Sequence, residues 1–128
     1  MLVQNKLTYS VGRPSWLKKI RLLISLTPFA WVSFFYLFVL RVYIQLGKIP
    51  AYNLPDPKDL GYSIHHTILF FSIPICLLSI ILYPVIVFFS RKTQPVSLKE
   101  IFLFLLGVSL FTIQIYFDPL QLQIWFMD

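Results

Sequence analysis

Side chains that can donate, accept or carry a proton recur at helical spacing in two apolar parts of the chain. In the first part they stand 7, 4, 3 and 4 residues apart, which places them on one face of a helix, and they are His65, Ser72, Cys76, Ser79 and Tyr83. In the second part Glu100, Gly107, Gln114 and Asp118 follow one another at intervals of 7, 7 and 4. Two antiparallel helices would bring these stripes together, with Gly107 at the closest approach.

The paired stripes have two interpretations. A polar line through a bilayer could pass protons or ions, and His65, Ser72, Gln114 and Asp118 would form it. Small and hydroxyl-bearing residues on one face also let membrane helices pack closely, with hydrogen bonds worth about 0.6 kcal/mol each. The sequence favours a packing seam, because no Asp, Glu, His, Lys or Arg stands near the middle of either apolar run.

Two adjacent histidines, His65 and His66, follow a loop that carries Asp56 and Asp59. Neighbouring residues of a helix point about 100° apart, so the two imidazoles are poorly placed to bind one metal ion. An enzyme that acts on lipid with these histidines and aspartates is a further alternative. The chain has no motif of a nucleophile elbow, a phosphate-binding loop or a zinc protease. We therefore expect no enzymatic activity, no metal and no cofactor.

The loop itself, residues 47–63, is rich in proline. Pro50, Pro55 and Pro57 restrict the backbone and favour an extended, semi-rigid path. One interpretation is a stiff connector packed on the helix ends, which is the simpler one. The other is a surface for a protein partner, for which the candidate residues are Tyr52, Asn53, Asp56, Lys58 and Asp59.

The composition predicts that these residues are positioned by membrane-spanning helices. Of the 128 residues, 58% are hydrophobic and only 12% are charged, against about 25% charged in a typical soluble domain. A soluble core of this size cannot hide so much apolar surface. The length fits a single membrane domain over residues 1–128, and the lone Cys76 excludes an intramolecular disulfide.

We predict an all-α integral membrane protein with three transmembrane helices, at about residues 22–46, 64–89 and 98–117. Pro74 and Pro84 lie inside the second helix and predict a kink. Ser97 and Glu100 have the spacing of a capping box at the start of the third. Before the first helix, residues 1–21 form a basic, cytoplasmic or interfacial segment. After the third, residues 118–128 form an interfacial tail.

The distribution of positive charge predicts the orientation. Three spans divide the cations into two groups, of which the larger is Lys6, Arg13, Lys18, Lys19, Arg21, Arg91, Lys92 and Lys99, and the smaller is Arg41, Lys48 and Lys58. Cytoplasmic loops carry the excess of Lys and Arg, so the N-terminus is expected in the cytoplasm and the C-terminus on the extracytoplasmic side. A multi-pass protein of the plasma membrane or the bacterial inner membrane is favoured. Because the net charge of +6 adjoins membrane spans, we expect no nucleic-acid partner.

Two functions remain open. Three helices leave surface to spare, which favours an accessory or assembly subunit that binds other membrane proteins or a second copy of itself. The alternative is a homo-oligomeric channel or proton-conducting unit that uses the polar stripe.

Overall fold

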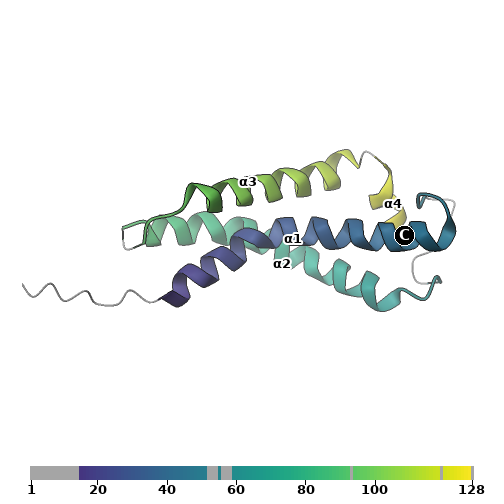
Figure 1. Ribbon diagram of the computed structural model, residues 1–128, viewed down its shortest axis with the longest axis horizontal. Helices are drawn as coiled ribbons and strands as arrows, with labels where there is room; N and C mark the ends of the chain where they lie inside the picture. The colour runs from purple at the N-terminus through teal and green to yellow at the C-terminus, as the bar shows by residue number, and fades with distance from the viewer. Residues whose placement is uncertain (1–14, 52–54, 56–58, 93, 119, 128) are drawn as a thin grey trace, which may run out of the picture.

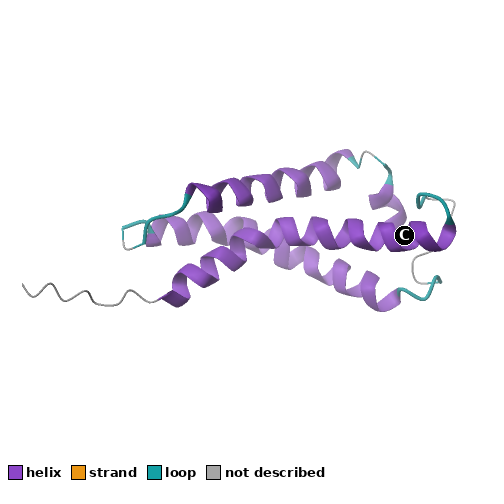
Figure 2. Cartoon of the chain, in the orientation of Figure 1, coloured by secondary structure: helices purple, strands orange, loops and turns teal. Residues whose placement is uncertain are grey.

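The computed structural model describes residues 15–51, 55, 59–92, 94–118 and 120–127, and in this part of the chain the regular structure is entirely helical. In order, the elements are α1 (Ser15–Leu46), α2 (Ser63–Ser90), α3 (Leu98–Thr112), the π-helical turn η1 (Ile113–Phe117) and α4 (Leu122–Met127). Three segments are long and apolar enough to cross a membrane: Trp16–Leu46, Ser63–Ser90 and Leu98–Phe117. The predicted all-α fold with three spans is therefore confirmed (Figures 1 and 2).

Helix α1 is the central element and packs along both α2 and α3 (Figure 1). Most of its buried side chains alternate at intervals of four and three residues, and these are Arg21, Ser25, Pro28, Val32, Phe35, Val39 and Val42. Trp31 and Phe38 are buried beside them. This heptad spacing is the pattern of helices that wrap around one another with a left-handed twist. Pro28 removes one amide from the helix ladder, and α1 is visibly bent.

Helix α1 ends at a glycine that adopts a left-handed conformation. Gly47 has a φ of +69°, and its amide donates to the carbonyl of Tyr43 at 2.8 Å. This geometry satisfies a carbonyl of the last turn and stops the helix, and glycine adopts it without a steric penalty. The chain then turns away from α1 toward the start of α2.

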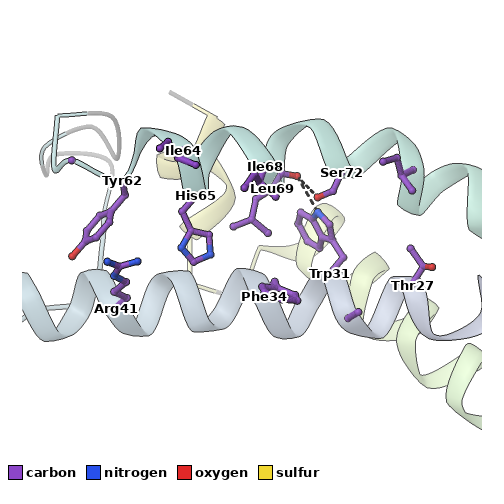
Figure 3. Close-up of a pocket in the computed structure, with 13 residues that line it drawn as sticks. Thr27, Trp31, Phe34, Arg41, Tyr62, Ile64, His65, Ile68, Leu69 and Ser72 are labelled. Atoms are coloured by element: carbon purple, nitrogen blue, oxygen red, sulfur yellow. Dashed lines mark hydrogen bonds between the residues drawn. The ribbon is translucent and has the colours of Figure 1, made fainter. Parts of the chain in front are cut away.

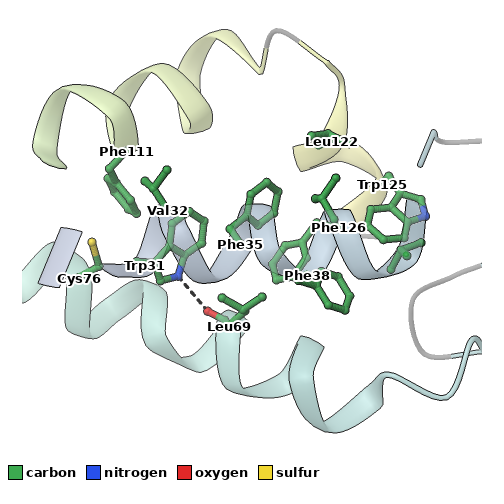
Figure 4. Packing of buried hydrophobic residues seen from close by; sticks show 12 residues of the cluster. Trp31, Val32, Phe35, Phe38, Leu69, Cys76, Phe111, Leu122, Trp125 and Phe126 are labelled. Carbon is green, nitrogen blue, oxygen red and sulfur yellow. Dashed lines mark hydrogen bonds between the residues drawn. The ribbon is translucent and has the colours of Figure 1, made fainter. Parts of the chain in front are cut away.

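The core is an aromatic cluster on α1 (Figure 4). The Trp31 ring meets Phe111 of α3 edge-on, with centroids 5.1 Å apart. Phe35 and Phe38 are fully buried, and both rings contact Phe126 of α4. Edge-to-face pairs of this kind contribute about 0.5–1.5 kcal/mol each beyond the burial of their area.

Helix α4 folds back onto this cluster. The predicted interfacial tail, residues 118–128, thus includes buried side chains: Leu122, Trp125 and Phe126 are each at most 1% exposed. The reversal begins at Asp118, whose backbone is left-handed with a φ of +34°. Its carboxylate accepts hydrogen bonds from the amides of Gln123 at 2.9 Å and Ile124 at 3.3 Å, and so stabilises the start of α4.

The proline-rich loop is described only in part. Four of its candidate partner-binding residues, Tyr52, Asn53, Asp56 and Lys58, lie outside the described residues. The fifth, Asp59, lies in an exposed turn. Pro50 is buried, and the carbonyl of Pro55 accepts a hydrogen bond from Nε1 of Trp125 at 3.2 Å. In these places the loop packs on the end of the helices, as a connector does.

Candidate functional site

A groove of about 640 Å³ runs between α1 and α2 and is open on one side. Figure 3 shows side chains from both helices directed into the space between them. At one end the lining is polar, with Arg41, Tyr62 and His65; the remainder is largely apolar and includes Phe34 and Ile68. The groove therefore presents a charged end and a hydrophobic wall on the same face of the molecule.

The polar end is built from residues on facing helices. The guanidinium of Arg41 lies 4.7 Å from the centroid of the Tyr62 ring, which is a cation–π contact. The Tyr62 hydroxyl in turn donates to the side-chain carbonyl of Gln45. His65 packs against Phe38 with centroids 5.1 Å apart. Of the described residues that line the groove, Arg41 is the only one with a formal charge, and none is a carboxylate.

The floor of the groove is fixed by a shared carbonyl on α2. Nε1 of Trp31 donates to the carbonyl of Leu69 at 3.2 Å, and the Ser72 hydroxyl donates to the same oxygen at 2.7 Å (Figure 3). Pro74 lacks the amide that would donate to the carbonyl of Phe70, the residue after Leu69. The indole of Trp31 thus joins α1 to α2 in the turn next to this gap in the helix.

A second polar cluster lies at the end of the bundle where α2 connects to α3. Arg21 is 0% exposed, and its Nε lies 2.7 Å from Oε1 of Glu100, which is 5% exposed. The Arg21 guanidinium also donates to the hydroxyl of Ser90 at 3.1 Å and to the carbonyls of Gln94 at 3.4 Å and Pro95 at 3.2 Å. One buried arginine therefore joins all three spanning helices and the loop between two of them.

This cluster differs from the sequence-based interpretation of its members. Arg21 was expected in the basic interfacial segment before the first span, but α1 begins at Ser15, so Arg21 lies inside the helix. Glu100 was assigned to a capping box with Ser97. Ser97 is the N-cap residue, and its hydroxyl accepts from the amide of Lys99, but the Glu100 carboxylate is directed to Arg21. The one feature of the sequence that distinguishes Glu100 is that it is the only glutamate in the chain.

The stripe on α2 is placed partly as its spacing predicts. Cys76, Ser79 and Tyr83 are buried in the bundle. Near the N-terminal end of α2, however, the inward residues are His66 and Leu69, whereas His65 and Ser72 line the groove. Leu69, Cys76, Tyr83 and Ser90 recur every seven residues, so the buried face keeps the same phase on both sides of Pro74, and His65 and Ser72 lie beside this face in the groove.

The stripe on α3 is buried but faces a different neighbour from the one predicted. A Cβ on Gly107 would lie only 2.7 Å from the backbone nitrogen of Phe29. The close approach at Gly107 is therefore to α1, and the predicted pairing with Cys76 and Ser79 is not formed. Helix α1 packs along both other helices, so α3 meets α1 at this point. Side chains of α2 and α3 do meet where Tyr83 stacks on Phe104, with centroids 4.1 Å apart.

The last two residues of that stripe belong to a hydrogen-bonded chain. The Tyr36 hydroxyl donates to Oε1 of Gln114 at 2.6 Å, and Nε2 of Gln114 donates to Oδ1 of Asp118 at 3.2 Å. Since Asp118 also accepts from the amides of α4, the chain links α1, η1 and α4. Gln114 lies in η1 and Asp118 directly after it, whereas His65 and Ser72 line the groove between α1 and α2. These four residues therefore do not form one continuous line.

The two histidines have separate roles. Nε2 of His66 lies 2.7 Å from the carbonyl of Phe126, so His66 fastens α2 to α4, whereas His65 faces the groove. Asp118 is hydrogen-bonded to Gln114 and to the amides of α4, and it is His66 that contacts the backbone of α4. Among the described residues, no group of three or more His, Cys, Asp or Glu side chains is arranged to hold a metal ion.

The groove and the buried ion pair are the two structural features of the described residues that bear on function. Comparison of the chain with protein-family models, with curated protein sequences and with solved structures returned no match. The chain is a small protein with three helices that are long and apolar enough to span a membrane.

Proposed function

We propose that the protein is an accessory or assembly subunit, not an enzyme, and that it acts by contacts with other membrane proteins. The observation that carries this proposal is the unequal burial of the three spans. The apolar span of α1 is 39% buried and that of α3 is 28% buried, but that of α2 is only 17% buried. Helix α2 therefore offers the most lateral surface to a neighbour.

The outer face of α2 is both apolar and shaped by its prolines. Leu78 and Ile81 are 54% and 64% exposed, and Pro74 and Pro84 are also on the exposed surface. In lipid, association of helices depends on packing between surfaces of defined shape, because lipid tails are as apolar as leucine. A helix interrupted twice by proline presents such a shape. The ion pair of Arg21 and Glu100 supports the proposal, since it holds α2 and α3 in a fixed arrangement.

The orientation that we propose in the membrane follows from the charge distribution. We place the N-terminus in the cytoplasm and the 47–62 loop on the opposite side of a plasma membrane or bacterial inner membrane, because most cations then lie on the cytoplasmic side. The loop and α4 then form one extracytoplasmic face, and the neighbouring protein can contact this face as well as α2. The channel alternative is less favoured, because its four polar residues are divided between two sides of α1.

Site-specific photocrosslinking in native membranes tests the proposal. A photoreactive residue at Leu78 on α2 is expected to give discrete protein adducts, and one at Leu105 on α3 is expected to give fewer. The same variants, purified and reconstituted alone in lipid vesicles, are the control, because only adducts between copies of this chain can form there. The proposal fails if Leu78 gives no protein adduct in native membranes under conditions in which lipid adducts form.

A further inference from the structure

The groove between α1 and α2 combines one positive charge with a long apolar wall. Arg41 is exposed, stacks on Tyr62 and has no carboxylate among the described groove residues. His65 supplies a second polar side chain beside it (Figure 3). A ligand that matches this end carries a negative charge and accepts hydrogen bonds, and phosphate is one of the two groups, with carboxylate, whose geometry the guanidinium matches.

The position of Arg41 along α1 matches the depth of a lipid headgroup. Arg41 lies one to two turns before the end of the helix at Leu46, which is about 7 Å from the helix end at about 1.5 Å per residue. Cations near the end of a spanning helix reach the interface, where lipid phosphates lie. From Arg41 the groove follows α1 back to Thr27, a distance of about 21 Å. This path leads from the interface into the hydrocarbon region, as an acyl chain does.

The shape of the groove suits a lipid chain. It is polar at one end, open on one side and largely apolar along the rest of its length. Its wall is lined by bulky side chains, Phe34, Ile68 and Ile75, which fit flexible hydrocarbon between them.

We propose that the groove binds an anionic phospholipid from the leaflet on the side of the 47–62 loop. The phosphate contacts Arg41 and His65, and one acyl chain lies along Phe34, Ile68 and Ile75. This inference does not depend on the proposed function, because the outer face of α2 and the groove are different surfaces.

Native mass spectrometry of the full chain in mild detergent tests the charged end. The probes are phosphatidylglycerol and phosphatidylcholine with identical dioleoyl chains. The wild-type protein is expected to retain phosphatidylglycerol about tenfold more strongly, because the choline group of phosphatidylcholine brings a second positive charge close to Arg41. Arg41→Gln is expected to remove most of this preference. Lys48→Gln removes a cation next to the end of the same helix but outside the groove, and is expected to keep the preference.

A second variant tests the apolar wall. Ala30 lines the groove, and Ala30→Trp fills part of it. This change is expected to weaken both lipids about equally, whereas Leu105→Trp on the exposed face of α3 leaves both unchanged. Helical circular dichroism and the thermal midpoint of each variant establish that it is folded.

Three results would overturn the lipid site. The first is equal retention of the two lipids by the wild-type protein. The second is an equal loss of preference in Arg41→Gln and Lys48→Gln, which indicates general surface charge. The third is displacement of phosphatidylglycerol by millimolar inorganic phosphate alone, which indicates a simple anion site without a role for the acyl chain.

Discussion

Helix α1 has two interfaces that are joined in different ways. Three kinds of contact join α1 to α3 and η1 along most of the length of α1. Arg21 forms an ion pair with Glu100, and Phe29 approaches Gly107 closely. The Tyr36 hydroxyl donates to Gln114. The interface of α1 with α3 is closely packed. The interface of α1 with α2 is closely packed at Trp31 but opens into a groove toward Arg41.

The two arginines of α1 show what this difference means. Arg21 is fully buried and its donors are directed to a carboxylate, a hydroxyl and two carbonyls. Arg41 is exposed and contacts an aromatic ring. On the same helix, Arg21 therefore stabilises the packing of the helices, whereas Arg41 presents its positive charge at the surface. Substitutions along α1 and its partners measure how far this distinction holds.

The largest effect is expected from Glu100→Ala. This change leaves the charge of Arg21 buried without a carboxylate, which typically costs about 3–5 kcal/mol of the free energy of unfolding. The measurement is reversible unfolding in mixed micelles or bilayers at increasing denaturant. The double variant Arg21→Met, Glu100→Leu is expected to regain most of the loss, because it removes both charges. A loss below about 1 kcal/mol in Glu100→Ala would show that water or lipid reaches the pair.

A smaller loss is expected when the close approach of α1 and α3 is obstructed. In Gly107→Ala the new methyl group would lie 2.7 Å from the Phe29 nitrogen, so the helices must separate, at a cost of about 1–3 kcal/mol. The thermal midpoint of unfolding reports the change. Ser109→Ala on the exposed face of α3 is the matched control and is expected to have little effect. Equal midpoints in the two variants would contradict the tight packing of this interface.

The hydrogen bond from Tyr36 to Gln114 is expected to contribute less. Tyr36→Phe removes the hydroxyl but keeps the ring, and the expected loss is about 0.6 kcal/mol, the average for a hydrogen bond between membrane helices. Tyr116→Phe is the control, since Tyr116 is 81% exposed. The difference between the two variants isolates the bond, and a difference of zero would show that Gln114 finds another partner.

The smallest change in stability is expected at the open interface. Arg41→Gln removes an exposed charge with one cation–π contact, so its effect on the free energy of unfolding is expected to stay within about 0.5 kcal/mol. The same unfolding measurement as for Glu100→Ala allows a direct comparison of the two ends of α1. A loss as large as that of Glu100→Ala would mean that Arg41 is a structural residue after all.

The three spans could be predicted because they depend on length and on the positions of charge and proline. The predicted second helix, 64–89, agrees closely with Ser63–Ser90, and the third, 98–117, agrees with α3 followed by η1. The predicted first helix begins at about residue 22, whereas α1 begins at Ser15. The difference arises because Lys18 and Arg21 have the pattern of an interfacial segment that precedes a span. A buried arginine inside a helix has no local pattern that distinguishes it from an arginine at a membrane surface.

The arrangement of the helices could not be predicted from the polar stripes. In a membrane protein, apolar side chains cover both the inner and the outer faces of a helix, so the central position of α1 has no signature in hydrophobicity. Its inner face is formed by Trp31, Phe35 and Phe38, which also suit contact with lipid. The groove depends on the distance between two helices, and Arg41 could be recognised only as a cation near the end of a span.

The burial of Arg21 has a consequence for how the protein is made. In the proposed orientation, Arg21 is one of the cytoplasmic cations whose excess orients the chain during insertion. In the folded protein its charge is balanced by Glu100 and is buried. Under that proposal the residue acts twice, first in setting the topology and later in holding the helices together. Replacing Glu100 affects only the second stage, whereas replacing Arg21 weakens both.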